Sequence, residues 1–455
     1  MIDLFFKNMR KIFLFLAVIY NSVLLGQTIV TSYPLDIKNP KESDQILNFE
    51  NTVTHEVIAF IASQENFTIL KYNSALFLTD QFTGQVEYKN RSLMGYSFSE
   101  DGNPTLYWYS EISKDIIIVK YYFETKTSKA LKFEYAVSSE LIVTSFQKDN
   151  TFNLLTQHKS APALILYVFK NGIVEEKILD FTPFKFQDIK TQPKSFNQIL
   201  KDYPIEKMEP GEYNPLLKVV GKTKLYLLSN RLILTLDHSL KKTQLFDINL
   251  SNLQIKEQNF LQPISKKVSK SSNSYYHENK LFQVNTNADE LLLDVKKLDS
   301  ETVMKSITVS KNDTIRFKNS PLLIQRDNFK PTELKNTAKF LQQLSSSDIG
   351  VSVFKSKKNL FITIGGQQQI DQSFDGFYPI IMTKSIFFET IWNKALEFTT
   401  EEQQPLALDK IYLFMDSHKE VSLENIMKFK DHFILGYFDT KTKQYTMRKF
   451  TDGYD

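Results

Sequence analysis

The chain has 455 residues and not one cysteine. Without a thiol, catalysis by a cysteine nucleophile, a cysteine-ligated metal site and a disulfide framework are all excluded. A lipid anchor on cysteine, as found in bacterial lipoproteins, is excluded as well. The fold must therefore be held by its hydrophobic core, which a chain of this length can supply.

Local signatures of catalysis are also missing. None of the six histidines belongs to a His-Glu-x-x-His pattern or lies four residues from another histidine, and no Gly-x-Ser-x-Gly elbow occurs. The segment Gly221-Lys222-Thr223 resembles the end of a phosphate loop, but leucine occupies position 216, where that loop needs glycine. We therefore predict no catalytic residue, no metal and no cofactor from local motifs.

The charge is close to balanced. Lysine and arginine total 56, aspartate and glutamate 52, and the formal net charge is +4. So small an excess on a chain of this size gives no reason to expect nucleic-acid binding. Lysine greatly outnumbers arginine, and we interpret the lysines as solubilising residues on strand edges and turns.

The N-terminus carries an export signature. Lys7, Arg10 and Lys11 precede an apolar run over 12–25, and Gly26-Gln27 is a plausible cleavage point. This length suits a secretory signal peptide over 1–26 and is short for a membrane span. An uncleaved anchor is the alternative. No second long apolar run follows, so we expect a soluble mature chain over 27–455. Secreted eukaryotic domains usually contain disulfides, whereas a bacterial envelope protein need not, so we expect a periplasmic or secreted protein and favour the periplasm.

A short pattern recurs along the chain: an apolar strand end, an acidic residue, a polar turn and a second strand. It is clearest at 123–133 and 388–398. The acidic residues are spaced by 44, 123, 47, 95 and 50 positions, which we read as one, three, one, two and one repeat units. They are Asp80, Glu124, Asp247, Asp294, Glu389 and Asp439.

A repeat of 40 to 50 residues with several short strands is typical of a propeller blade. Within one unit, strands are expected over 224–228, 231–236, 243–248 and 253–258. Asn171-Gly172 marks a tight hairpin turn in another unit. We predict an all-β fold, a β-propeller of about seven to eight four-stranded blades with a minor inserted helix. Two β-sandwiches are the alternative.

The segment Ser99-Glu100-Asp101-Gly102, followed by a strand through Trp108, resembles the Ser-x-Asp-Gly strand start of TolB-like propeller repeats. The resemblance covers one unit of the chain. It implies the propeller fold and no activity, since that family includes binding scaffolds and hydrolase-associated propellers.

Two segments interrupt the repeat. Residues 183–215 are rich in Lys, Gln and Pro and are expected to form an inserted loop that contains a short helix at 196–202. Residues 331–344 have Leu334, Ala338, Leu341 and Leu344 at helical spacing and are expected to form an inserted helix. Gly365-Gly366 is interpreted as a hairpin turn.

Loop residues are the remaining site candidates. Asp237 and His238 follow the second strand of the 224–258 unit, on the face that commonly binds ligands in propellers. Asn285, Asn287 and Asp289 occupy the equivalent loop one unit later. Their alternate oxygens could begin a calcium loop, but Glu290 replaces the glycine such a loop needs. An ordinary Asn/Asp turn is the alternative.

Together these features favour an exported β-propeller that acts as a non-catalytic binding or scaffold protein of the bacterial cell envelope. Its partner would be another envelope protein. The alternative is a propeller-type hydrolase that acts on glycan or peptide through carboxylates gathered at the central channel. A third possibility is a structural subunit with an exposed apolar patch.

Overall fold

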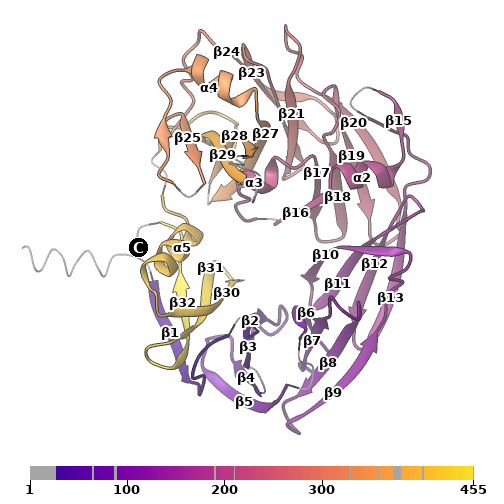
Figure 1. Ribbon diagram of the computed structural model, residues 1–455, viewed down its shortest axis with the longest axis vertical. Helices are drawn as coiled ribbons and strands as arrows, with labels where there is room; N and C mark the ends of the chain where they lie inside the picture. Colours follow the sequence, from indigo (N-terminus) through magenta and orange to yellow (C-terminus); the bar gives the residue numbers. More distant parts are fainter. Residues whose placement is uncertain are drawn as a thin grey trace, which may run out of the picture.

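The computed structural model describes residues 27–453, except 42, 64–65, 87–89, 189–190, 210, 328, 357, 372–380 and 402–403. The predicted signal peptide, 1–26, lies outside the described residues. Within them the chain forms seven sheets of four or five strands, which follow one another around a ring (Figure 1). This arrangement is a seven-bladed β-propeller.

The first three blades are regular four-stranded sheets with neighbouring strands antiparallel. Blade 1 is β2 (Gln45–Glu50), β3 (Val57–Ser63), β4 (Asn66–Tyr72) and β5 (Leu78–Gln85). Blade 2 is β6 (Ser92–Phe98), β7 (Pro104–Tyr109), β8 (Ile116–Tyr122) and β9 (Thr127–Phe133). Blade 3 is β10 (Glu140–Lys148), β11 (Thr151–His158), β12 (Ala163–Lys170) and β13 (Ile173–Asp180).

The next three blades include two five-stranded sheets. Blade 4 is β16 (Ile205–Met208), β17 (Thr223–Leu227), β18 (Arg231–Leu236), β19 (Lys242–Asn249) and β20 (Ile255–Leu261), with β16 parallel to β17. Blade 5 is β21 (Ser271–His277), β22 (Lys280–Thr286), β23 (Glu290–Lys297) and β24 (Val303–Ser310). Blade 6, in sheet order, is β27 (Asp348–Ser356), β28 (Asn359–Asp371), β29 (Ile381–Trp392), β25 (Leu323–Arg326) and β26 (Thr332–Glu333).

The two ends of the described chain close the ring. Blade 7 contains β30 (Val421–Phe429), β31 (His432–Asp439) and β32 (Gln444–Phe450), and its fourth strand is β1 (Gln27–Pro34), which pairs antiparallel with β32. The first residue of β1 is thus the first residue after the predicted cleavage point. Because β1 from the start of the described chain completes the sheet formed by its last strands, the two ends of the chain are held together in blade 7.

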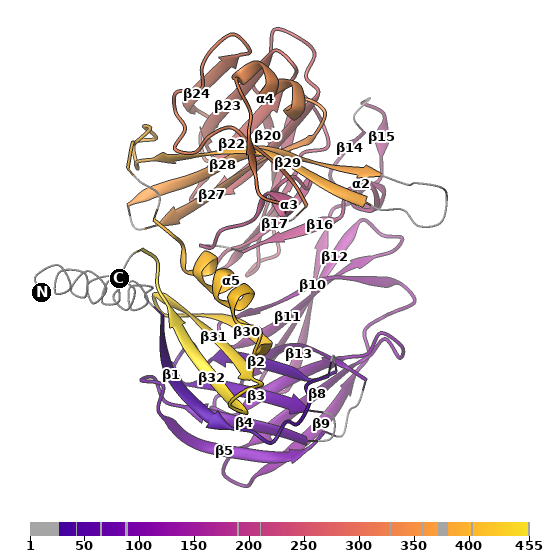
Figure 2. The same cartoon turned by 60° about the vertical axis from the view of Figure 1, so that its left-hand side comes forward.

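Blades pack through shared apolar clusters. Separate clusters join blade 7 to blade 1, blade 1 to blade 2, blade 2 to blade 3 and blade 3 to blade 4, and one large cluster joins blades 4, 5 and 6. Among the described residues no such cluster spans blades 6 and 7. Instead α5 (Ala407–Ser417) buries Ile411 and Phe414 against blade 7 and leaves Tyr412 and Leu413 exposed (Figure 2).

The six recurring acidic residues each fall in a different blade, but their spacing gave too many repeat units between them. Asp80, Glu124, Asp247, Asp294, Glu389 and Asp439 lie in or beside the third or fourth strand of blades 1, 2, 4, 5, 6 and 7. The step of 123 residues spans two units rather than three, and the step of 95 spans one rather than two. Insertions inside those steps, and not additional blades, account for the excess length.

The first insertion, 183–215, is folded against the ring. It contains the hairpin β14 (Phe186–Gln187) and β15 (Pro193–Lys194), then α2 (Phe196–Asp202) and β16. The side chain of Ser195 caps α2 by accepting from the Gln198 N–H, and Phe196 stacks on Phe181 at 4.2 Å between ring centroids. The short α3 (Leu216–Val219) follows directly.

The helix predicted over 331–344 is shorter than expected, because α4 is Thr337–Leu344. Asn336 starts it by accepting the Lys339 N–H at 2.9 Å. The preceding residues instead form β26, which pairs with β25. The leucine spacing was helical, but the cap, not the proline, sets the first turn.

The prediction of a turn at Gly365-Gly366 is wrong. Both glycines lie inside β28, paired with Phe387 and Ile386. A Cβ on Gly365 would lie 2.3 Å from the Ile386 oxygen, so glycine here permits close backbone approach. By contrast, Asn171 and Gly172 both have positive φ, 50° and 76°, and form the predicted tight turn between β12 and β13.

The Ser-x-Asp-Gly segment forms the turn between β6 and β7. The Gly102 N–H donates to the Ser99 carbonyl at 2.9 Å, and the Asp101 carboxylate accepts from Lys120 at 2.7 Å. This geometry fixes the start of β7 and is structural.

Candidate functional site

Asp237, predicted as a loop residue, is buried in an ion pair. Its carboxylate lies 3.0 Å from the Lys224 ammonium, and both side chains are fully buried. Thr243 and Ser274 donate to the same carboxylate at 2.7 and 2.8 Å. Burial lowers the pKa of Lys224, and Asp237 opposes that shift. Asp237 is therefore fully engaged in holding blade 4 to blade 5.

Asn273 extends this network toward blade 6. Its Oδ1 accepts from the Lys224 ammonium, and its Nδ2 donates to the carbonyls of Val220 at 2.9 Å and Ile349 at 2.7 Å. Buried polar groups of this kind are stable only when each finds partners. The network ties β17 of blade 4, β21 of blade 5 and β27 of blade 6 together beneath one rim of the ring.

His238 lies at that rim, beside a pocket of about 170 Å³ shared with the β14–β15 hairpin. Its Nε2 is 2.6 Å from the Gln187 carbonyl, so this nitrogen carries the proton. Burial lowers the pKa of His238. Its ring stacks on Tyr203 with 6.0 Å between centroids. The Asp237 side chain thus contacts Lys224 while the His238 side chain contacts the Gln187 carbonyl, and the two do not form a catalytic pair.

The second group of predicted residues forms a turn rather than an open ligand set. Asn287 accepts the N–H groups of Asp289 and Glu290 at 2.8 and 3.0 Å. Asn285 donates to the Pro263 carbonyl at 2.8 Å. Asp289 pairs with two lysines at 2.6 Å each, which lower its pKa, and these are Lys267 and Lys311. The described residues contain no cluster of three or more side chains suited to a metal ion.

The segment between β16 and β17 lies on the inner side of the ring (Figure 1). Asn214 donates to the Tyr275 hydroxyl of blade 5 at 2.9 Å, and its carbonyl accepts from Ser352 of blade 6 at 2.6 Å. The Gly211 carbonyl accepts from Lys428 of blade 7 at 3.4 Å. The chain's own 211–220 segment, which we call the central segment, therefore bridges three blades from within.

A larger pocket, of about 580 Å³, opens beside the central segment on the Tyr203 side. We call it the edge pocket. Its charged lining residues are Asp202, Glu206, Asp348 and Lys222, so carboxylates outnumber the single ammonium. Lys222 donates to the Ser272 carbonyl at 2.9 Å and lies 3.8 Å from the Asp348 carboxylate. Burial lowers the pKa of Lys222.

One wall of the edge pocket is the strand β28 at Gln367, Gln368 and Gln369. Its inner neighbour β27 begins at Asp348, which pairs with Gln367. Beyond that point β28 continues to Asp371, paired only with β29. The β28–β29 arm thus extends past the rest of blade 6, as Figure 2 shows.

The alternating hydrogen-bond pattern of an antiparallel pair shows which main-chain groups of β28 do not bond to β29. The N–H of Thr383 donates to the Asp327 carboxylate, and its C=O accepts from the Asp327 N–H, so both groups point outward, away from β28. Because Thr383 faces Gln369 in the register, the N–H and C=O of Gln369 point away from β29, toward the edge pocket. No hydrogen bond within the described residues uses them.

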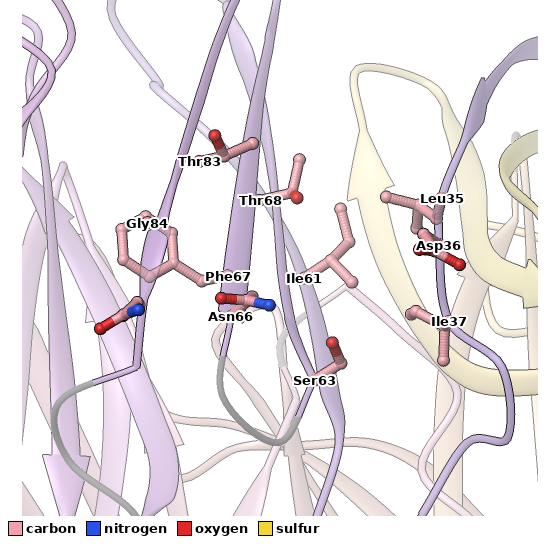
Figure 3. Close-up of a pocket in the computed structure, with 11 residues that line it drawn as sticks. Leu35, Asp36, Ile37, Ile61, Ser63, Asn66, Phe67, Thr68, Thr83 and Gly84 are labelled. Atoms are coloured by element: carbon pink, nitrogen blue, oxygen red, sulfur yellow. The ribbon is translucent and has the colours of Figure 1, made fainter.

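A further pocket of about 430 Å³ lies between the β1–β2 connection and blade 1 (Figure 3). Neutral polar side chains, including Asn66, Thr68 and Thr83, line it with Phe67 and one carboxylate, Asp36. It brings no ionisable cluster together.

Sequence reasoning did not single out the residues of the edge pocket. The polar run Gln367-Gln368-Gln369 was taken as the strand after a glycine turn, and Lys222 only as part of a rejected phosphate loop. One feature of the sequence could have indicated this strand: Leu360–Ile370 is long for a strand of this fold. The partner strand's later start could not be known.

Neither a scan against protein-family models nor a search of curated proteins gives a match. Among solved structures, the Nup133 β-propeller domain of Vanderwaltozyma polyspora is similar over 94% of this chain and 97% of that domain, with 11% identity and a TM-score of 0.34. The propeller of the trilobed protease from Pyrococcus furiosus is similar over 89% and 95%, with 12% identity and a TM-score of 0.30. The WD40 domain of SCAP from fission yeast is similar over 94% and 91%, with 7% identity and a TM-score of 0.30. These likenesses concern the propeller fold alone.

Proposed function

We propose that this protein is an exported, non-catalytic β-propeller that binds a protein partner in the bacterial cell envelope. The observation that carries the proposal is the rim of blades 4 to 6, where a pocket of about 580 Å³ meets an unpaired strand edge. Main-chain groups left open beside a pocket are suited to holding another chain.

The N-terminal sequence supports the location. Positive residues before an apolar run of signal-peptide length favour export, and the absence of cysteine suits a bacterial envelope protein. Among the described residues, no helix is long and apolar enough to cross a membrane.

The hydrolase alternative needs carboxylates gathered at the centre of the ring. Burial raises the pKa of Glu212, with Glu209 adding to the shift, and burial also raises the pKa of Asp409. Glu212 belongs to the central segment and Asp409 to the first turn of α5. The central segment itself occupies the inner side of the ring, which does not favour a substrate site there.

The test is a cross-linking pull-down from native envelope extract with mature protein starting at Gln27. We expect stoichiometric capture of one protein partner. Cell fractionation with an antibody to the chain should place it outside the cytoplasm. Retention of glycan or peptide fragments that the protein then cleaves, with no partner captured, would overturn the proposal in favour of the hydrolase.

A further inference from the structure

The geometry points to the partner's form: we infer that the edge pocket holds an extended, basic peptide segment as an added strand on β28. This inference rests on the proposed binding function and deepens it. The peptide would lie where the line of β27 would continue before Asp348. Its main chain would pair with Gln369, and a lysine or arginine side chain would enter the pocket.

The main-chain part of the argument is the free edge. The N–H and C=O of Gln369 point toward the pocket and have no partner among the described residues. A strand added at the usual spacing would satisfy both groups, which is how peptides bind to sheet edges. The chain itself leaves this position open because it turns at Ser345–Ser347 to connect α4 with β27.

This edge also lacks the features that normally protect one. Exposed strand edges are usually blunted by lysine or proline. Four outer strands, β9, β13, β20 and β24, each carry at least one lysine, whereas the outer strand β5 carries neither lysine nor proline. The free part of β28 reads Gln-Gln-Ile-Asp, with neither residue type. It therefore lacks the protection that lysine gives to the edges of β9, β13, β20 and β24, and in this respect it resembles the edge of β5.

The charge of the pocket selects the side chain. Glu206 and Asp348 line it, and Asp348 is 69% exposed. Asp202 already accepts from Lys194 and Gln198. The one ammonium present, Lys222, is anchored to the Ser272 carbonyl. A cationic side chain would complement Glu206, and also Asp348, whose carboxylate lies 3.8 Å from the Lys222 ammonium, whereas an acidic side chain would be repelled.

The test uses three fluorescein-labelled peptides of about ten residues in which threonine alternates with lysine, glutamine or glutamate. Binding to the mature protein is followed by fluorescence anisotropy. We expect the lysine peptide to bind and the glutamate peptide not to bind, with the glutamine peptide weaker than the lysine peptide. No binding of the lysine peptide at about 1 mM, or equal binding of all three, would overturn the inference.

A matched pair of variants separates the strand edge from general electrostatic attraction. Gln369→Pro removes the N–H that faces the pocket, while Gln369→Ala removes the side chain and keeps the N–H. We expect Gln369→Pro to weaken binding of the lysine peptide about tenfold and Gln369→Ala to change it little. Equal affinity of the two variants contradicts strand addition, provided both show the wild-type urea midpoint.

A second pair tests the charge. Glu206→Gln with Asp348→Asn should weaken binding of the lysine peptide and leave the glutamine peptide unchanged. Glu111→Gln, which neutralises an exposed carboxylate on blade 2, is the control and should have no effect. Hydrogen exchange provides an independent readout, because the Gln369 amide should become protected only when the lysine peptide is bound.

The two proposals fail separately. If the envelope pull-down captures a partner equally well with Gln369→Pro, the binding function stands and the edge inference falls. If the lysine peptide binds as predicted but no envelope protein is captured, the edge site stands and the proposed function falls.

Discussion

The buried pair of Lys224 and Asp237 provides the sharpest test of how the ring is held together. We consider Lys224→Met, which keeps the length and apolar stem of the side chain and removes the charge. The Asp237 carboxylate would keep its hydrogen bonds from Thr243 and Ser274 but would lose the Lys224 ammonium with which it forms its ion pair. Removing one partner of a buried pair costs about 3–5 kcal/mol, because the remaining charge stays desolvated.

The control is the exposed pair of Lys355 and Glu278, which are 2.5 Å apart with side chains 37% and 48% exposed. Lys355→Met should cost only about 0–1 kcal/mol, because water already screens this pair. The double variant Lys224→Met with Asp237→Asn removes both buried charges and should recover much of the loss. These costs are measured as changes in the free energy of unfolding in urea, followed by tryptophan fluorescence.

Both tryptophans are suited to this assay, because Trp108 and Trp392 are 3% and 1% exposed and become hydrated on unfolding. A cost for Lys224→Met as small as that for Lys355→Met would refute the view that the buried network locks blades 4, 5 and 6 together.

Three further predictions concern other parts of the ring. Gly436→Ala should destabilise the blade 7–blade 1 contact by about 1–3 kcal/mol, since the new Cβ would lie 2.1 Å from the Asn48 amide nitrogen; a urea midpoint equal to the wild type would contradict this. The Arg91 guanidinium holds the pKa of Asp115 well below its usual value. The stabilising contribution of Asp115 is therefore present above about pH 4 and is lost as the pH falls through the lower pKa of the folded state. Asp115→Asn should flatten the acid side of a plot of unfolding free energy against pH. Deleting residues 27–34 should lower the urea midpoint and favour association between chains, because β32 then becomes an exposed edge; light scattering that shows a monomer with wild-type stability would argue against closure by β1.

The sequence carried the repeat well because blade strands are short and buried in a periodic way. The expected strands at 224–228, 231–236, 243–248 and 253–258 correspond to β17–β20, with ends within three residues. The insertions were harder to predict. When repeat units are counted only from the spacing of the acidic residues, the length of an insertion is mistaken for an additional unit.

The helix α5 was missed altogether. Its apolar residues Ile411, Phe414 and Met415 have helical spacing, but no element was predicted in this segment. Its role depends on the ring, because it covers the face of blade 7 that another blade would otherwise cover.

Several side chains of the candidate loops are buried, among them Asp237, Asn285 and Asn287, whereas Asp289 pairs with two partly exposed lysines. Asp237 was expected at a binding face and instead pairs with Lys224. The pair could not be recognised from the sequence, because Lys224 lies on the adjacent strand β17 and is 13 residues away. The edge pocket depends on where β27 starts relative to β28. That offset is a property of the sheet and has no local sequence signature.

The central claim is that this propeller binds a partner chain through the free edge of β28. The most direct measurement is the envelope pull-down carried out in parallel with wild-type protein, Gln369→Ala and Gln369→Pro. The account predicts one stoichiometric partner with the wild type and with Gln369→Ala, and markedly reduced capture with Gln369→Pro. Equal capture by all three proteins, or capture by none, would contradict it.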